Sequence, residues 1–335
     1  MPWAPSGPAD ATGSRLDRRS LLRLGSAAAL SAAAVVGAGS AFVAPAAAAV
    51  PQWPGHKPGR IYLGAASYPN DISQVVNRTG PLGMRRTFYK WGDGAREDKA
   101  IRADHAARRM PWISFKPPST SPGGWRAVSS GKHDAELRAR ARRYAGYSQP
   151  VVVTFNHEPH NDSTGTPAEF IAAWARVHDV MRSETGLKNV VSAPIIGEWV
   201  FNPVNRRHAP EQFINQGMLD RCHFLGVDLY QMKSGQAYDI RLGRVVDWLD
   251  AKGYSNKMVG VGETGATNAF GRPTGAEWWT SSWKWAAANT GRVGAISYFD
   301  TLHNNNAGLN WLLAESSAKL SAFRASATSS VACVL

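Results

Sequence analysis

Short apolar segments alternate with amphipathic segments along most of the chain. The apolar segments are rich in β-branched residues, as in Val151–Glu158, which is typical of strands buried on both faces. Eight such segments predict strands, at Ile61–Ser67, Met84–Trp91, Trp112–Pro117, Val151–Glu158, Val190–Ile196, Phe224–Tyr230, Met258–Glu263 and Ala295–Asp300.

The amphipathic segments predict helices between these strands. One of them is Pro167–Thr185, which has Thr166 before it at the N-cap position and Pro167 at the first helical position. Helices are also predicted at Asp71–Arg78, Ala95–Arg109, Asp134–Tyr147, Pro210–Gly217, Ile240–Lys252, Gly275–Asn289 and Leu309–Ala325. Connections too long for hairpins indicate a parallel sheet, and eight repeats of strand and helix predict a single-domain α/β fold, the (β/α)8 TIM barrel.

The first 49 residues have the composition of an export signal. Paired arginines in Asp17–Arg23 precede an Ala-, Leu-, Val- and Gly-rich segment that reaches Val43, and Ala44–Ala49 adds small residues. This order predicts a twin-arginine signal peptide at residues 1–49, cleaved near Ala49, and hence a secreted, extracellular bacterial protein. A membrane anchor is the alternative, which the cleavage-like run disfavours.

Residues 50–335 suit one barrel domain of roughly 250 residues, and we expect them to form a monomer. They contain no second apolar run long enough to span a bilayer, so we expect no membrane association after cleavage. The net charge of +13 is concentrated in Ala95–Arg109 and Glu136–Arg143. Acids and alanines at helical spacing are mixed into both segments without interleaved aromatics, which predicts solvated helix faces rather than a nucleic-acid surface.

The two cysteines, Cys222 and Cys333, are far apart in the sequence. In an exported protein they could form one disulfide that fixes the C-terminal tail to the barrel. Neither cysteine has the C-x-x-C partner or the histidine spacing of a zinc site. We expect no cofactor.

Aromatic and acidic residues collect at the carboxyl ends of the predicted strands, where barrels place their catalytic groups. A sugar stacks its apolar faces on aromatic rings and hydrogen-bonds to acids, so this pattern predicts a polysaccharide or oligosaccharide substrate. The aromatic candidates for substrate binding are Trp91, Trp199, Tyr230 and Tyr298.

Glu158 and Glu263 are the carboxylates with the most distinctive surroundings, His157-Glu158-Pro159 and Gly262-Glu263-Thr264. Hydrolysis of a glycosidic bond uses two carboxyl groups, one that protonates the leaving oxygen and one on the other side of the reacting carbon. His157 is placed to orient a carboxyl group or to bind a substrate hydroxyl. The polar cluster lacks the helical His-Glu-x-x-His spacing of zinc proteases, so we expect no metal.

Several motifs resemble those of family 26 glycoside hydrolases and occur in that family's order over most of residues 50–335. These motifs are Ser130–Asp134, Asn156–Asn161, Pro167–Trp174, Gly226–Tyr230, Gly262–Gly265 and Tyr298–Asp300. The resemblance implies a retaining clan A (β/α)8 glycosidase, in a family of largely secreted β-mannanases with some β-glucanases and xylanases. It further implies Glu158 as acid/base, Glu263 as nucleophile, His157 as a substrate contact and Tyr230 as support for the nucleophile.

The chain departs from the mannanase pattern at two places. After the His-Glu pair it has Pro159–Asn161 instead of Met-Asn-Gly, and Ser163 stands where an aromatic residue is usual. Tyr298-Phe299 ends the eighth strand, where related enzymes often have a tryptophan. The resemblance as a whole implies an endo-acting, β-mannanase-like glycosidase for β-1,4-linked polysaccharide. The alternatives are a β-glucanase or xylanase, a transglycosylase with the same pair, and a non-hydrolytic carbohydrate-binding barrel.

Overall fold

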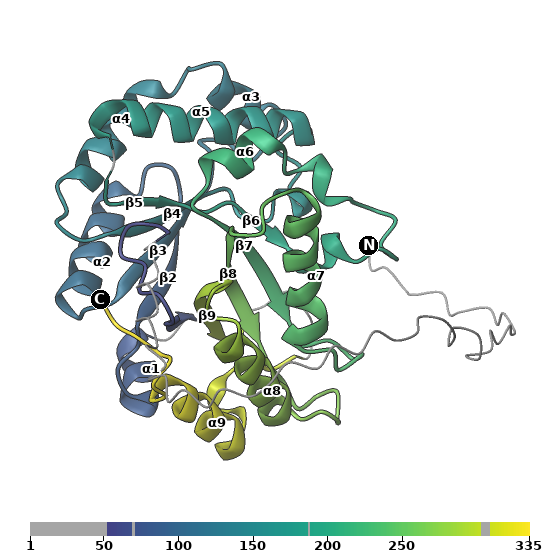
Figure 1. The fold of residues 1–335 in the computed structure, drawn as a ribbon. Coiled ribbons are helices and arrows are strands. Elements are labelled where there is room, and N and C mark those ends of the chain that lie inside the picture. Colours follow the sequence, from purple (N-terminus) through teal and green to yellow (C-terminus); the bar gives the residue numbers. More distant parts are fainter. Residues whose placement is uncertain (1–51, 69–70, 187, 303–308) are drawn as a thin grey trace, which may run out of the picture. The chain divides into compact units, whose positions relative to one another are not determined.

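The computed structural model describes residues 52–68, 71–186, 188–302 and 309–335, so the predicted export signal lies outside the described residues. Parallel strands form the centre of the fold and helices surround them (Figure 1). The strands are β1 (Tyr62–Tyr68), β2 (Met84–Tyr89), β3 (Met110–Phe115), β4 (Val151–Phe155), β5 (Val190–Ser192), β6 (Ile195–Gly197), β7 (Phe224–Tyr230), β8 (Met258–Gly265) and β9 (Val293–Thr301). Their order in the sheet is β5-β4-β3-β2-β1-β9-β8-β7-β6.

The predicted fifth strand is split into β5 and β6 by Ala193 and Pro194. Proline has no N–H to donate, so a ladder cannot run unbroken through this position. β5 pairs with β4 and β6 pairs with β7. The ring closes across the break, because Ala193 N donates to Val153 O (3.0 Å) and Gly226 N donates to Pro194 O (2.8 Å). The nine segments therefore form an eight-stranded barrel, and the predicted (β/α)8 TIM barrel is confirmed.

Helices follow the strands around the outside of the barrel. They are α1 (Ile72–Thr79), α2 (Gly94–Ala106), α3 (Gly124–Ser129), α4 (Asp134–Ala145), α5 (Pro167–Thr185), α6 (Gln216–Arg221), α7 (Tyr238–Ala251), α8 (Gly275–Ala288) and α9 (Ser317–Ala327). The predicted cap of α5 is confirmed, since Thr166 and Glu169 form a reciprocal capping box.

Two helix boundaries were predicted too early. The segment at Pro210 forms only a 3-10 turn, and α6 begins after Asn215, whose side chain accepts the Met218 N–H (2.8 Å). The final helix begins after Ser316, whose hydroxyl accepts the Lys319 N–H (3.2 Å). In both cases a side chain able to cap free N–H groups sets the start. Helix α3 was not predicted.

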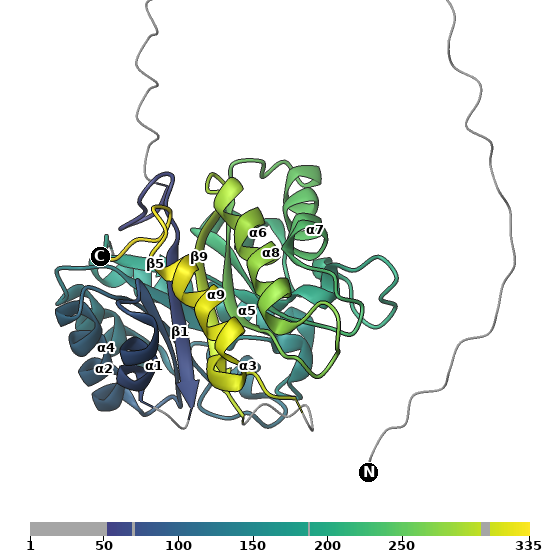
Figure 2. The ribbon, with the colours of Figure 1, turned by 90° about the horizontal axis from the view of Figure 1, so that it is seen from below.

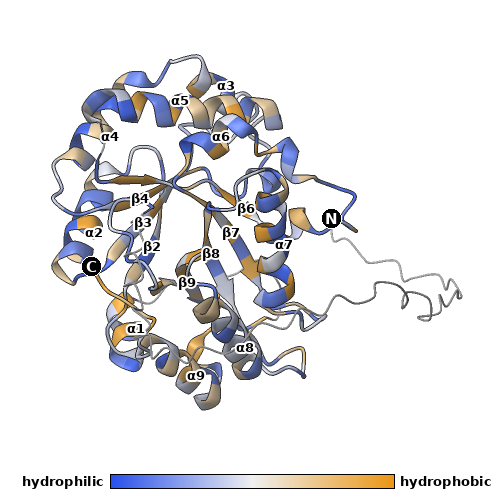
Figure 3. Ribbon diagram, in the orientation of Figure 1, coloured by the Kyte–Doolittle hydropathy of each residue, from blue (hydrophilic) through white to orange (hydrophobic). Residues whose placement is uncertain are grey.

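The amino-terminal half of the barrel interior is filled with large apolar side chains, including Trp53, Trp112 and Phe224. A second apolar layer lies between the strands and the helices, and the strands are accordingly among the most hydrophobic parts of the ribbon (Figure 3). Because the interior is packed at this end, the inside of the barrel can admit a ligand only from the carboxyl ends of the strands. None of the described helices has the length and apolar character that crossing a membrane requires.

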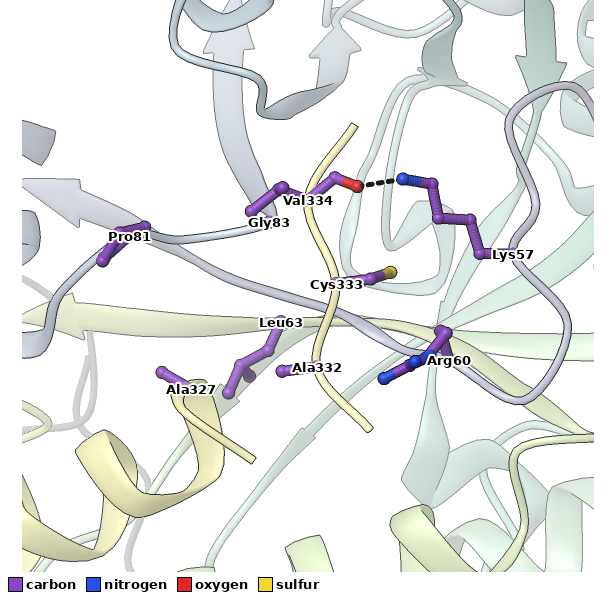
Figure 4. A pocket seen from close by; sticks show the side chains of 9 residues that line it. All are labelled: Lys57, Arg60, Leu63, Pro81, Gly83, Ala327, Ala332, Cys333 and Val334. Carbon is purple, nitrogen blue, oxygen red and sulfur yellow. Dashed lines mark hydrogen bonds between the residues drawn. The ribbon is translucent and has the colours of Figure 1, made fainter. Parts of the chain in front are cut away.

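The chain segment that contains Cys333 lies beside the start of β1, where Cys333 N donates to Ile61 O (3.0 Å) (Figure 2). Both cysteines are free thiols, so they do not form the disulfide that the sequence left possible. Cys222 is buried at the end of α6, whereas Cys333 lines a cavity of about 410 Å³ at the amino ends of the strands (Figure 4). Lys57 Nζ donates to Val334 O (2.6 Å) at this cavity, which has no carboxylate side chain in its lining.

Candidate active site

The carboxyl ends of β4, β7 and β8 bring three carboxyl groups to one cavity of about 730 Å³, hereafter the larger cavity. Glu158 follows β4, Asp228 lies in β7, and Glu263 lies in β8. Tyr230 and Trp199 also line it. The structure therefore brings together four of the residues that the sequence analysis proposed, from strands far apart in the chain: Glu158, Glu263, Tyr230 and Trp199.

The backbone turns sharply where β4 delivers Glu158. The strand ends at Phe155, three residues before the predicted end, because Asn156 (φ 46°) and Glu158 (φ 51°) have left-handed conformations. Asn156 N still donates to Phe115 O (2.9 Å), and Glu158 N donates to Ile195 O (3.0 Å). A left-handed glutamate is strained by about 1 kcal/mol or more, and such strain is concentrated at functional sites.

Glu158 has the protonation behaviour of a general acid. Its Oε2 accepts a hydrogen bond from Asn161 Nδ2 (3.2 Å). Burial and the nearby charge of Glu263 raise the pKa of Glu158 from 4.5 to about 7. A carboxyl group with this pKa is about half protonated at pH 7, so near neutral pH it can donate its proton to a leaving group.

Glu263 is held by groups that favour its ionised form. Its side chain is mostly buried, and burial raises its pKa. Arg86 and the hydroxyl of Tyr230 oppose this effect. Arg86 NH2 lies 4.0 Å from Glu263 Oε1, and Tyr230 OH donates to Glu263 Oε2 (2.7 Å). An oriented carboxylate with these two partners has the arrangement of a nucleophile.

A bulge in β8 lets Glu263 reach the cavity. Val227 is aligned with Val261, but the next residue, Asp228, is aligned with Glu263, so Gly262 is skipped. A Cβ on Gly262 would lie 2.8 Å from Asp228 Oδ1, so the site requires glycine here. Bulges of this kind redirect side chains next to active sites.

Asp228 is the third carboxyl group of the larger cavity. Neither of its carboxyl oxygens has a hydrogen-bond partner in the described part of the chain. Burial, together with the charges of Glu263 and Glu158, raises its pKa well above the usual value. Burial therefore favours the neutral form of Asp228, which is able to donate a hydrogen bond to a bound molecule.

The sequence analysis missed Arg86, which lies fully buried in β2. Arg86 NH1 donates to Ser114 Oγ (2.9 Å), and the guanidinium packs between the rings of Phe88 (4.7 Å) and Trp112 (5.4 Å). The available signal was an arginine in the middle of a segment read as a buried strand, since a buried charge requires a partner.

The sequence analysis also missed Trp311, which lines the larger cavity beside Tyr230 at a ring distance of 5.1 Å. A Cβ on Gly265 would lie 2.9 Å from the Trp311 ring, so glycine permits this packing. The sequence placed Trp311 inside a predicted helix, but α9 begins only at Ser317. The chain thus supplies a cavity tryptophan after β9, although strand β9 itself has none.

A smaller cavity of about 450 Å³ continues the site on the other side of Glu263 and Phe299, which line both cavities. We call the two cavities together the cleft. His157 lines the smaller cavity, with its ring 5.3 Å from that of Phe88. Burial lowers the pKa of His157 well below 6.5, so the imidazole is neutral. Its Nδ1 has no partner in the described residues and is available to a ligand.

Two of the predicted substrate contacts do not reach the cleft. Trp91 packs edge-on against Phe115 (5.7 Å) and His133 (5.5 Å), in the layer between strands and helices. Tyr298 is fully buried, and its hydroxyl donates to Ala266 O (3.2 Å). Neither side chain lines either cavity, so these positions do not agree with contact to a substrate.

A buried ion pair fixes the backbone behind Tyr230. Arg241 NH1 donates to Tyr230 O, while Arg241 Nε donates to Glu198 Oε2 (2.7 Å). Only 5% of Arg241 and 1% of Glu198 is exposed. The pair joins the residues after β6 to the end of β7, so it positions the tyrosine that contacts Glu263. No group of three or more His, Cys, Asp and Glu in the described residues could hold a metal ion.

Comparison with known proteins identifies similar folds. No protein-family model and no curated protein matches the sequence. Among solved structures, an endo-β-1,4-mannanase double mutant from Cellulomonas fimi has 19% identity over 83% of this chain and 72% of its own, with a TM-score of 0.59. The catalytic domain of a GH26 endo-β-1,4-mannanase from Bacillus sp. JAMB-750 has 16% identity over 82% and 87%, with a TM-score of 0.57.

A further solved structure is a triple mutant of an endo-β-1,4-glucanase from Xanthomonas axonopodis pv. citri. It has 12% identity over 80% of this chain and 99% of its own, with a TM-score of 0.57. At these identities the likeness concerns the fold. The chain has the (β/α)8 barrel that also occurs in these β-glycan-cleaving enzymes.

Proposed function

We propose that this protein is a retaining glycoside hydrolase that cleaves β-linked polysaccharide internally, with β-1,4-mannan-like chains as the first candidate substrate. The observation that carries the proposal is the pair Glu158 and Glu263, which line one cavity in different electrostatic surroundings. Glu158 has a pKa of about 7 and, among the described residues, forms no ion pair, whereas Glu263 has a cation nearby in Arg86 and a hydrogen-bond donor in Tyr230.

In the first step, the protonated carboxyl of Glu158 gives its proton to the glycosidic oxygen as the bond from that oxygen to the anomeric carbon breaks. The carboxylate of Glu263 attacks the anomeric carbon and forms a glycosyl ester. Arg86 and Tyr230 keep Glu263 ionised and oriented before the attack. As Glu263 loses its charge, the electrostatic cause that raises the pKa of Glu158 also disappears.

In the second step, Glu158 is a carboxylate and accepts a proton from a water molecule. The oxygen of that water attacks the anomeric carbon and displaces Glu263, which regenerates both groups. Two displacements at the same carbon retain its configuration. In the intermediate, Glu263 is an ester and carries no charge. This lowers the pKa of Glu158, which suits its role as a base in this step.

The shape of the cleft supports internal cleavage. Cavities lie on both sides of Glu263, and both are open to solvent. Sugar units can therefore occupy positions on both sides of the reacting bond. Trp199 offers an aromatic surface in the larger cavity, while Phe88 does so in the smaller one.

The test is the variant Glu263→Ala with and without azide, on mannan, galactomannan, mixed-linkage glucan and xylan. We expect reducing-end release from at least one polymer by the wild type and none by the variant. Azide should restore cleavage of an activated glycoside with the inverted glycosyl azide as product, because the small anion occupies the space left by the carboxylate. Near-normal turnover without azide would rule out Glu263 as nucleophile.

Two further assays separate the remaining alternatives. Product analysis with an added acceptor sugar distinguishes hydrolysis from transglycosylation by the same pair. Saturable binding of a polymer without any bond cleavage would identify a carbohydrate-binding barrel instead.

We also propose that the protein is exported by the twin-arginine route. This proposal rests on the sequence of residues 1–49 alone. Replacing both Arg18 and Arg19 with Lys should abolish appearance of the protein in the culture medium. Unchanged secretion of that variant would contradict the proposal.

A further inference from the structure

The two cavities of the cleft differ in charge. The larger cavity is lined by the carboxyl groups of Glu158, Asp228 and Glu263 and by two cationic side chains, Lys233 and Arg241. The smaller cavity is lined by three cationic side chains, Lys90, Arg96 and Lys116, and contains one acid of its own, Asp93. Cationic side chains therefore outnumber acidic ones in the lining of the smaller cavity, whereas the reverse holds in the larger cavity.

The cations of the smaller cavity are not all neutralised by the protein. Lys116 Nζ is paired with Asp162 Oδ2 (2.9 Å). Arg96 contacts Asp93 Oδ2 through NH1 alone (3.1 Å), and 74% of its side chain is exposed, so most of its donors remain free. Lys90 pairs with no carboxylate in the described part of the chain. Free guanidinium and ammonium donors suit a carboxylate, and arginine binds it with two parallel hydrogen bonds.

An apolar surface lies next to these cations. The ring of Phe88 is 37% exposed and lies 6.1 Å from that of Phe299, and both rings line the smaller cavity. Exposed aromatic rings at the edge of a cavity offer flat apolar faces on which a sugar ring can stack. The smaller cavity thus combines a face on which a sugar ring can stack with an edge that can bind an anion.

We propose that the smaller cavity binds a uronic acid unit, so that the substrate is an acidic β-glycan. The sugar ring stacks on Phe88 and Phe299, and its carboxylate is bound by Lys90 and the free donors of Arg96. This inference rests on the proposed function, because it assigns the substrate of the same cleft. It narrows the substrate class from β-linked polysaccharides in general to those that carry carboxylates beside the cleaved bond.

The alternative explanation is general attraction between a basic protein and an acidic polymer. The chain has a net charge of +13, and attraction of this kind does not depend on any particular lysine. Two controls address it. Lys233 is an exposed lysine that lines the larger cavity. Lys99 and Lys132 are exposed lysines outside both cavities, so their joint replacement removes the same charge as the test variant.

The experiment uses pairs of polymers with one backbone, unmodified and with part of the C6 hydroxyls oxidised to carboxylates. Mannan and mixed-linkage glucan are prepared in this way, and glucuronoxylan is compared with its carboxyl-reduced form. The quantity measured is the ratio of kcat/KM on the acidic form to kcat/KM on the neutral form. We expect a ratio of about ten or more at low salt that falls towards one near 1 M salt, where charges are screened beyond about 3 Å.

The double variant Lys90→Gln/Arg96→Gln should lower this ratio by about tenfold, through a loss of kcat/KM on the acidic polymer. The Lys233→Gln and Lys99→Gln/Lys132→Gln controls should keep the wild-type ratio. A wild-type ratio of one or less would overturn the inference. So would a ratio that all variants reduce equally, because it would reflect net charge alone.

Failure of the proposed function is a separate result. If no polymer is cleaved, retardation of the intact protein in native gels that contain each polymer still decides the inference. Stronger retardation by the acidic form that only Lys90→Gln/Arg96→Gln removes would support the acidic-sugar site in a protein without hydrolytic activity. Equal retardation of all lysine variants would refute it.

Discussion

The side-chain amide of Asn161 donates the hydrogen bond that Glu158 accepts at its Oε2. This bond stabilises the ionised carboxylate and therefore lowers the pKa of Glu158, whereas burial and the charge of Glu263 raise it to about 7. The variant Asn161→Ala removes the donor and leaves the other two influences in place. The pKa of Glu158 should therefore rise further in the variant.

The expected size of the change follows from the geometry. A hydrogen bond to a charged group contributes about 1.5–3 kcal/mol when it is well formed. The Asn161 bond is long, at 3.2 Å, and its donor is exposed, so we take about 0.7 kcal/mol. Since 1.36 kcal/mol corresponds to one pH unit, the pKa should move from about 7 to about 7.5.

The assay is the pH dependence of kcat/KM on an oligosaccharide glycoside with a poor leaving group. Glu158 acts as an acid only while it is protonated, so the rate falls as pH rises through its pKa. The falling limb should therefore lie near pH 7 in the wild type and about half a unit higher in Asn161→Ala. On a dinitrophenyl glycoside, whose leaving group needs no proton, this limb should be absent from both proteins.

A limb that moves to lower pH in Asn161→Ala would refute this account of Glu158. The same conclusion would follow from an unchanged limb on the glycoside with the poor leaving group, because the amide would then have no influence on the proton donor. Persistence of the limb on the dinitrophenyl glycoside would show that another group controls it.

Three further changes have defined outcomes. Ionising Glu158 in its buried position costs about 3 kcal/mol at pH 8, so the free energy of unfolding falls as the pH rises from 4.5 to 7. Scanning calorimetry should therefore show that Glu158→Gln raises the Tm by about 5 °C at pH 8 but not at pH 4. Tyr230→Phe removes the hydrogen-bond donor to the proposed nucleophile Glu263, so kcat should fall about tenfold to a hundredfold. The pKa of Glu263 should rise, which moves the acidic limb of the pH profile to higher pH. An unchanged acidic limb would contradict the role of the hydroxyl. Arg241→Gln leaves Glu198 buried without its main partner and should lower the free energy of unfolding in urea by about 3–5 kcal/mol. The control Arg244→Gln removes only a 3.7 Å contact to the same carboxylate and should lower it by less than about 1 kcal/mol. Equal losses in the two variants would show that Arg241 is no more important than Arg244.

The sequence predicted the architecture well because periodicity and helix caps are local properties. It could not predict the break in the fifth strand, since Val190–Ile196 is apolar on both sides of Pro194 and the effect of the proline depends on which neighbours pair there. The left-handed turn at Asn156 was missed for a related reason. The turn is stabilised by hydrogen bonds to β3 and to Ile195, which are distant in the sequence.

The structure brings the two predicted glutamates to one cavity, but two of the predicted aromatic contacts, Trp91 and Tyr298, line neither cavity. Successive side chains of a strand point to opposite faces, so neighbours such as Tyr298 and Phe299 have opposite fates. Phe299 lines the cleft, whereas Tyr298 packs against Trp279 under the helices. Only the register of β9 decides between them, and a shift of one residue would exchange their roles. Trp311 reaches the cavity through a long connection after β9, which no local pattern indicates.

The break between β5 and β6 has a consequence for how the protein responds to heating. Only three aligned residue pairs join β4 to β5, and three join β6 to β7, whereas seven join β7 to β8. Glu158 is attached to the barrel at this break through its N–H bond to Ile195, while Glu263 belongs to one of the long ladders.

The two glutamates that we propose as catalytic therefore lie on parts of the barrel with unequal resistance to local opening. Amide hydrogen exchange should be faster around Ile195 than around Glu263 well below the unfolding transition. Because catalysis requires both carboxyl groups in register, the temperature of highest activity should lie below the Tm. On heating, the active site would then lose its geometry at a lower temperature than the one at which the barrel unfolds.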